Sequence, residues 1–229
     1  MNLNDKIVEL IKNEENFETG DWYSWNINLE NIPCEITLSN ENSFIKNKEL
    51  RLKLNQLLVN TNDIELKREI IHYYVVTWGN IKGNGNAKME FYYSSSIEDL
   101  KKSINGIASW SKILSIYDPR KYAIYDARVS ASLNCIQKIF DIDTKILSPI
   151  LPSQNKIISS NNVLIREISK REKWKKVVRK NYYEEIYLPL LNNIANELKV
   201  EIDTVEMYLF ANAEKFANKL KCFQIKYLI

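Results

Sequence analysis

The turn at residues 104–108, between two predicted helices, has the residue types and spacing to bind an anion. Gly106 can adopt the positive φ that such a turn requires, because it has no Cβ. The amides after Gly106 open the next helix, where they have no intrahelical partner and lie at the positive end of the helix dipole. We therefore expect an anion site suited to a phosphate, and one that reads no base sequence.

Two further groups follow this turn along the chain. Lys112 lies on the helix after the turn, and Asp126 comes 14 residues later, at the end of a short extended link over residues 121–125. Asp126 opens another predicted helix, and an N-cap role alone explains an aspartate there. The plain interpretation of Lys112 is a solvated or salt-bridged lysine.

Together these pieces resemble the motif of the helix-hairpin-helix DNA glycosylases, in the branch of the 8-oxoguanine DNA glycosylases. The hairpin and helix start are similar to Gly106-Ile107-Ala108-Ser109-Trp110-Ser111. The segment with the family's catalytic aspartate is similar to Ala123-Ile124-Tyr125-Asp126-Ala127-Arg128-Val129. The motif covers about 35 of the 229 residues. A narrower resemblance is to small bacterial proteins with this fold, some of them encoded in anti-phage operons beside nucleotide-cyclase-like enzymes.

The resemblance implies that Asp126 and Lys112 are catalytic. Breaking an N-glycosidic bond develops positive charge on deoxyribose, which a nearby carboxylate stabilises while a nucleophile adds to C1′. In the bifunctional branch the nucleophile is a lysine amine, which forms a Schiff base and permits strand cleavage. Such an amine must be partly deprotonated, a state that burial or a neighbouring cation favours. The DNA-binding residues implied by the resemblance are Asn105, Gly106, Ile107, Ala108 and Arg128.

Several positions depart from the family pattern. The lysine of the bifunctional branch comes four residues after the first hairpin glycine, and this chain has Trp110 there, as in relatives that use only the aspartate. Lys112 lies two residues later, about 200° further around the helix. Ala108 and Asn105 stand in place of the second glycine and the usual proline. Core packing is the plain interpretation of Trp110, and Arg128 is expected either to contact phosphate or to pair with a carboxylate.

The elements that must position these groups are predicted to be helices. Five glycines and five prolines are few for 229 residues, and apolar residues recur at helical spacing. We expect an all-α, two-lobed glycosylase-like fold with a cleft between the lobes. The chain would form a single glycosylase-like unit over 1–229, with the hairpin and aspartate segment at 96–140 and a C-terminal helical part at 160–229. The predicted helices span 3–16, 43–59, 63–79, 97–103, 108–117, 127–140, 162–180, 183–198 and 203–220.

Asp63 and Ser96 are predicted N-caps, and residues 18–40 and 141–161 are predicted to be irregular. Residues 79–86 hold three of the five glycines. A mobile surface loop is the better interpretation of this stretch, since a phosphate-cradling loop would end in Gly-Lys-Ser/Thr and follow a strand.

The composition argues against a metal centre and a disulfide framework. The three cysteines lie far apart, and His72 is the only histidine, so no ligand spacing is present. We expect Cys34, Cys135 and Cys222 to be small core residues and His72 to be packed or capped. The resemblance implies no cofactor beyond a monovalent cation that backbone carbonyls of the hairpin can hold.

Hydropathy argues against a membrane protein. No apolar run approaches the roughly 18 residues of a membrane span. The first residues alternate charged and apolar types, unlike a signal peptide. We therefore expect a cytoplasmic protein with no membrane partner.

The net charge of +3 conceals a basic segment at residues 166–180. Eight lysines and arginines there stand against two glutamates, with Trp174 among them. Such a segment can track a phosphate backbone. A solvated helix face is the alternative.

From this pattern we expect a DNA N-glycosylase that excises a modified, oxidised purine, with lyase activity if Lys112 reaches C1′. Its partners would be DNA and proteins of an anti-phage operon. One alternative is the same fold without catalysis, as a nucleic-acid-binding or protein-binding module in an anti-phage defence system. Another is an enzyme that acts on a free or protein-linked modified base. Steep salt dependence of DNA binding would favour a duplex binder.

Overall fold

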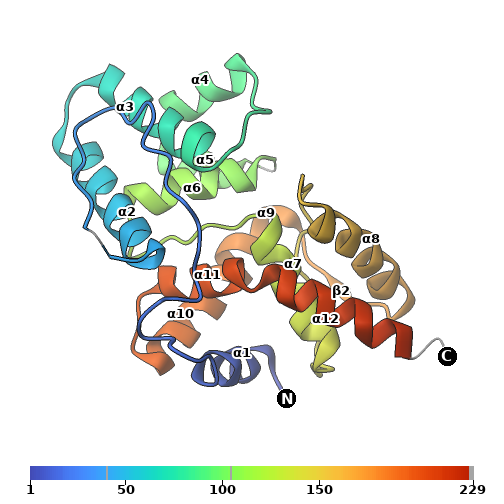
Figure 1. The fold of residues 1–229 in the computed structure, drawn as a ribbon. Coiled ribbons are helices and arrows are strands. Elements are labelled where there is room, and N and C mark those ends of the chain that lie inside the picture. The colour runs from blue at the N-terminus through green and yellow to red at the C-terminus, as the bar shows by residue number, and fades with distance from the viewer. Residues whose placement is uncertain (40, 104, 227–229) are drawn as a thin grey trace. The chain divides into compact units, whose positions relative to one another are not determined.

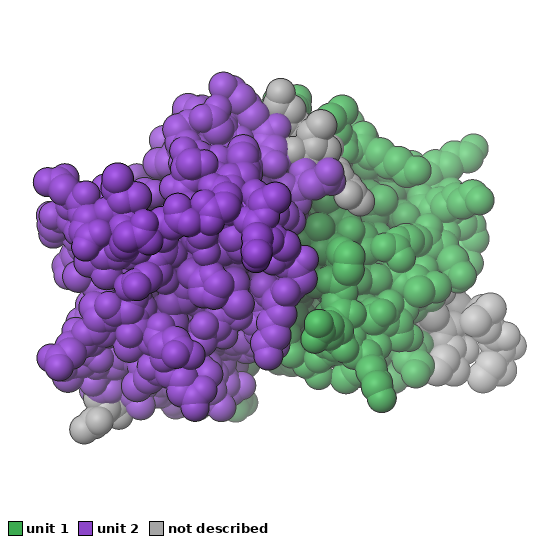
Figure 2. Space-filling model, turned by 90° about the horizontal axis from the view of Figure 1, so that it is seen from above, with its two compact units in different colours: residues 1–17, 125–229 green, residues 18–124 purple. Residues whose placement is uncertain are grey.

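The computed structural model describes residues 1–39, 41–103 and 105–226 and shows a predominantly helical chain (Figure 1). The all-α prediction is therefore confirmed. The described strands are β1 (Ile146–Leu147) and β2 (Lys175–Lys176), which pair in parallel with Ile146 opposite Lys175. The chain divides into two compact units (Figure 2): unit 1 comprises Met1–Phe17 and Tyr125–Ile229, and unit 2 comprises Glu18–Ile124.

Unit 2 begins with an irregular segment and continues as helices. Leu50 and Leu54 of its first long helix are fully buried, and this helix packs against the last helix of the unit. Stacking supports the interior too, since the rings of Tyr74 and Trp78 lie 4.3 Å apart and nearly parallel. The elements are α2 (Ser43–Asn60), α3 (Ile64–His72), the π-helix η1 (Tyr73–Trp78), α4 (Asn86–Ser94), α5 (Ile97–Lys102) and α6 (Ile107–Tyr117).

Unit 1 is built around one buried helix. Its Val129, Leu133 and Ile136 recur at helical spacing and are fully buried, and α1, α8, α11 and α12 all pack against it. The helix at the start of the chain thus joins the C-terminal part. The elements are α1 (Leu3–Lys12), α7 (Ala127–Ile139), α8 (Lys156–Arg171), α9 (Arg179–Tyr182), the π-helix η2 (Tyr183–Tyr187), α10 (Leu188–Leu198), α11 (Ile202–Ala211) and α12 (Ala213–Lys226).

The two predicted helix caps in unit 2 are confirmed. The Asp63 carboxylate accepts hydrogen bonds from the amides of Glu65 and Leu66 at the start of α3. The Ser96 hydroxyl accepts from the amide of Asp99 at the start of α5. Each cap satisfies amides that the first helical turn leaves without an intrahelical acceptor.

The predicted helix at 162–180 is wrong at both ends. Helix α8 starts six residues earlier, because the Asn155 side chain caps the amides of Ile157 and Ile158. It ends at Arg171, and Lys173 has a positive φ of 54° that turns the chain into β2. The basic segment is therefore a helix end, a turn and a strand instead of one helix face.

Four smaller predictions also need correction. The first helix ends at Lys12 and not at residue 16, and α4 falls in a stretch for which no helix was predicted. Of the cysteines only Cys135 is buried, whereas Cys34 is half-buried and Cys222 is exposed. His72 is exposed, and its Nδ1 lies 2.9 Å from the Tyr93 hydroxyl.

Candidate active site

The hairpin between α5 and α6 has the predicted backbone. Gly106 has a φ of 83°, and its carbonyl accepts hydrogen bonds from the amides of Ser109 at 2.8 Å and Trp110 at 3.0 Å. The amides of Ile107 and Ala108 belong to the first turn, where no earlier helical carbonyl is available to them. The helix start thus offers amides to an anion, as expected, while Ile104 lies outside the described residues.

Side chains from α4 explain why the turn needs glycine. A Cβ at Gly106 would overlap the Tyr92 hydroxyl and lie 2.9 Å from both Cε and Nζ of Lys88. Burial raises the pKa of Tyr92 to about 12, although a hydrogen bond with Ser109 lowers it. The hydroxyl therefore stays protonated at neutral pH, and it donates to the Gly106 carbonyl at 3.5 Å.

Lys88 is a functional candidate that sequence reasoning missed. Its half-buried side chain brings an ammonium next to the amide-bearing start of α6, and Nζ lies 5.7 Å from the centre of the Tyr92 ring. A cation beside free helix amides strengthens a phosphate site. No motif around Lys88 indicates this role, because the lysine reaches the hairpin only through the fold of α4.

Replacing Gly106 by alanine is expected to lower the free energy of unfolding by about 2 kcal/mol or more, since the positive φ is strained for alanine and the Cβ meets Tyr92 and Lys88. Equilibrium unfolding in urea measures the change. Gly83→Ala is the matched control, because a Cβ at Gly83 has nothing within 4 Å, and its effect should stay within about 0.5 kcal/mol. Equal effects of the two substitutions would contradict this hairpin geometry.

The glycine-rich stretch before α4 is a loop, as predicted, and it is bonded to its surroundings. The Gly79 amide donates to the Tyr74 carbonyl and the Ile81 amide to the Val75 carbonyl. At its other end, Nδ2 of Asn84 donates to the Ser109 hydroxyl at 3.0 Å. The loop therefore links η1 to the first turn of α6.

Lys112 is buried, with 4% of its surface exposed. Of the plain interpretations, a solvated or a salt-bridged lysine, the solvated one is therefore wrong. Its Nζ donates to the Ala108 carbonyl at 3.3 Å, one helical turn earlier. The methylene groups of Lys112 lie over the backbone of Gly79. A Cβ added at Gly79 would lie 2.7 Å from Cε and 2.8 Å from Cδ of Lys112. The absence of a side chain at Gly79 thus leaves room for the side chain of Lys112.

Gly79→Ala is expected to destabilise the protein less when Lys112 has already been shortened to alanine, because the Lys112 methylenes are then gone and, of the three nearest atoms, only the Val75 carbonyl oxygen still lies 2.7 Å from the new Cβ. The double-mutant cycle should give a coupling of about 0.5 kcal/mol or more. Thermal unfolding of the two single variants and the double variant supplies the three values. Strictly additive effects would show that Lys112 does not occupy the space above Gly79.

Asp126 caps α7, as predicted. Its Oδ1 accepts from the amides of Arg128 at 2.9 Å and Val129 at 3.0 Å. Within the described residues Oδ2 accepts no hydrogen bond, and the residue is half-buried. Asp126 adjoins buried tyrosines: burial raises the pKa of Tyr125 and Tyr187 well above its usual range, and the Asp126 charge adds to both shifts. The start of α7 thus holds one of the two carboxylate oxygens.

Arg128 pairs with a carboxylate, one of the two expected alternatives. Its guanidinium lies 2.5 Å from Oε1 of Glu214 and 5.1 Å from the centre of the Phe210 ring. Glu214 also accepts a hydrogen bond from Asn155. A phosphate contact by Arg128 would have to compete with this ion pair.

The structure brings the predicted residues together in two groups. Asn105 to Ala108 and Lys112 belong to unit 2, where Lys88 joins them, and Asp126 and Arg128 belong to unit 1. Trp110 is buried at 3% exposure, as core packing requires.

Among the described hairpin residues, the Asn105 and Gly106 carbonyls do not fit the monovalent cation that the resemblance implies. The Asn105 carbonyl accepts from the Ser103 hydroxyl, and the Gly106 carbonyl accepts from Ser109, Trp110 and Tyr92. These oxygens are engaged by protein donors, so we derive no step through a cation. In the part of the chain that the structure describes, no group of three or more His, Cys, Asp or Glu side chains is placed to hold a metal ion.

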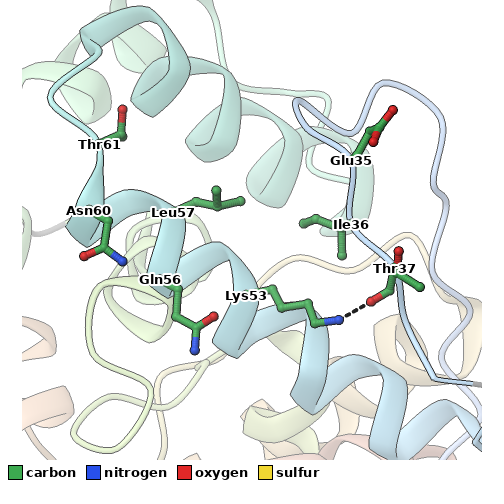
Figure 3. A pocket seen from close by; sticks show the side chains of 8 residues that line it. All are labelled: Glu35, Ile36, Thr37, Lys53, Gln56, Leu57, Asn60 and Thr61. Atoms are coloured by element: carbon green, nitrogen blue, oxygen red, sulfur yellow. Dashed lines mark hydrogen bonds between the residues drawn. The ribbon is translucent and has the colours of Figure 1, made fainter.

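Two pockets in unit 2 lie away from these residues. The larger, of about 570 Å³, lies between α2 and the segment at 35–37, where Lys53 donates to the Thr37 carbonyl (Figure 3). The second, of about 360 Å³, includes His72 and Tyr73. Neither pocket is lined by a predicted catalytic or DNA-binding residue. The larger pocket is lined by Glu35, Ile36, Thr37, Lys53, Gln56, Leu57, Asn60 and Thr61.

None of the described helices is long and apolar enough to cross a membrane. In comparisons with known proteins, no family model, no curated protein and no solved structure matches this chain.

Proposed function

We propose that this chain is a cytoplasmic DNA N-glycosylase that removes an oxidised purine. The observation that carries the proposal is the Asp126 carboxylate: the helix fixes Oδ1, and Oδ2 faces no protein donor among the described residues. Along the chain this aspartate follows the hairpin, whose helix start suits a phosphate, after helix α6 and a short link. A glycosylase needs these two functions, one to hold the backbone and one to stabilise the sugar cation.

In this proposal the hairpin holds one phosphate of the substrate strand. The amides of Ile107 and Ala108 donate to its oxygens, and the Lys88 ammonium supplies a charge-assisted contact. Neither interaction depends on base identity, so the hairpin positions the strand and leaves recognition of the lesion to other residues.

Asp126 then acts on the deoxyribose. As the bond between C1′ and the base breaks, the base leaves with the bonding electrons and takes up a proton, while positive charge develops on the sugar. A carboxylate already fixed by two helix amides stabilises that charge without having to reorganise. Its free oxygen is the one that would face C1′ or an attacking water.

Lys112 supports an additional lyase step. Its amine would add to C1′, which after base loss gives an open-chain Schiff base, and loss of the 3′ phosphate by β-elimination would cleave the strand. The burial of Lys112 supports this role. Its side chain is shielded from solvent, and its methylene groups pack closely against the backbone of Gly79.

Formation of abasic sites tests the glycosylase proposal. Supercoiled plasmid oxidised to carry 8-oxoguanine should be nicked by alkali after incubation with the protein, while undamaged plasmid should stay supercoiled. Equal nicking of both plasmids, or of neither, would count against an oxidised-purine glycosylase.

A catalytically inactive DNA-binding module is the second candidate. Its support is Trp110, which stands buried where the bifunctional branch has its lysine. In that case Asp126→Asn would leave both DNA binding and the biological function of the protein intact.

A further inference from the structure

Six exposed cations lie together in sequence and structure at the end of α8, on the turn that follows and on β2. Among residues 166–176 the only fully exposed acid is Glu167. We call these cations the basic surface: Arg166, Lys170, Arg171, Lys173, Lys175 and Lys176.

Backbone hydrogen bonds hold the segment that carries the basic surface. The Glu172 amide donates to the Ile168 carbonyl at 2.8 Å and the Trp174 amide to the Ser169 carbonyl at 2.9 Å, which closes the end of α8. Trp174 is 5% exposed and anchors the turn in the interior of unit 1. Strand β2 is held by its parallel pairing with β1. The cations therefore project from a defined scaffold.

The acid inside this turn offsets little of the charge of the basic surface, because its closest cation, Lys138, lies outside that surface. Oε1 of Glu172 pairs with Nζ of Lys138 at 2.5 Å, and Oε2 accepts from the Trp174 indole at 3.1 Å. Burial alone would raise the pKa of Glu172, but the hydrogen bonds from Lys138 and Trp174 lower it below its usual value. Glu172 is thus ionised and paired closely with Lys138, outside the basic surface, while the Arg171 guanidinium lies at 3.9 Å from Oε1. The other five cations of the basic surface have no such contact with Glu172.

We infer that the basic surface binds the phosphate backbone of duplex DNA. The inference takes its partner, DNA, from the proposed function, but it uses neither the hairpin nor Asp126. A polyanion with regularly spaced charges fits six exposed cations on one short scaffold. Because Trp174 is buried, the surface offers no aromatic ring to stack on a base or to enter a membrane interface, so it would contact phosphates without sequence preference.

The salt dependence of DNA binding tests this inference. Lys175 and Lys176 are exposed, and their pairing with β1 uses only backbone atoms. The double variant Lys175→Gln/Lys176→Gln should therefore fold normally. Fluorescence anisotropy with an undamaged 20-base-pair duplex, over a series of NaCl concentrations, should show the slope of log K against log [NaCl] reduced in magnitude by about 1.8, or about 0.9 for each lost phosphate contact.

Lys12→Gln/Lys199→Asn is the matched control. It removes the same charge from unit 1, at the end of α1 and just after α10, two helices that lie apart from α8 in Figure 1. Asparagine tolerates the positive φ of 57° at Lys199. The control should keep the wild-type slope.

Three results would overturn the inference: no binding of the duplex by wild type, a wild-type slope in the Lys175/Lys176 variant, or an equal loss in the control. Base release from a lesion-containing duplex, measured on the same preparations, separates the two proposals. Release with an unchanged slope would refute only the basic surface, whereas a reduced slope without release would refute only the glycosylase.

Discussion

Asp126→Asn is expected to slow base release by about 100- to 1,000-fold, the range found when one preorganised electrostatic group is removed from an active site. Asparagine keeps a side-chain oxygen for the amides of Arg128 and Val129, and it caps helices as well as aspartate does. The charge opposite the developing sugar cation is lost, but the cap is not. Single-turnover kinetics on a lesion-containing duplex, with enzyme in excess, measure the rate.

Asp63→Asn provides the matched control, since Asp63 caps α3 through the same pattern of two amides. Both variants should unfold within a few tenths of a kcal/mol of wild type. The Asp63 variant should release base at the wild-type rate. If both variants lost activity equally, the effect of Asp126 would be one of helix capping and not of catalysis.

Lys112→Gln is expected to abolish the covalent adduct that borohydride traps on a duplex with an abasic site. A Schiff base needs an amine, and glutamine at position 112 has none to offer for the bond that borohydride reduces. Base release should persist, because the carboxylate and a water can complete it without the amine. Gel electrophoresis of the trapped complex and a parallel assay of base release separate the two steps.

Lys88→Gln serves as the comparison for Lys112→Gln. It removes a lysine from the same unit that is assigned to phosphate contact, so it should weaken DNA binding while the adduct still forms at saturating protein. Persistence of the adduct in Lys112→Gln would assign the Schiff base to another amine. The Lys112→Met variant keeps the buried volume filled and guards against loss of folding.

The features that sequence reasoning predicted well are local. The caps of Asp63, Ser96 and Asp126 connect a side chain to amides two or three residues later, so the residue type and its place before an apolar run were enough. The turn at Gly106 was predictable for the same reason, because a positive φ is a property of a single residue.

The features that were mispredicted depend on contacts between distant segments. The end of α8 at Arg171 is set by the burial of Trp174 and by the pairing of β2 with β1, and neither appears in the helical periodicity of the basic segment. The stretch predicted as one helix at 63–79 is helical, but its second half is the π-helix η1 and not an α-helix. Stacking of Tyr74 on Trp78 accompanies that change of hydrogen bonding.

The site itself was predicted in part. The burial of Lys112 depends on Gly79, far earlier in the chain, and the place of Lys88 depends on a helix that the sequence did not reveal. Arg128 pairs with a carboxylate because the fold brings Glu214, 86 residues away, next to its guanidinium. Partners at such separations leave no trace in spacing, so only a structure can supply them.

Release of 8-oxoguanine tests the central claim most directly. The wild-type chain in excess over a duplex with one 8-oxoguanine would be incubated beside Asp126→Asn, and mass spectrometry would follow the free base and the abasic strand. We expect free 8-oxoguanine to accumulate one-for-one with abasic strand in wild type, and at least about 100-fold more slowly in Asp126→Asn. A duplex that stays intact with wild type, or an equal rate in both proteins, would contradict it.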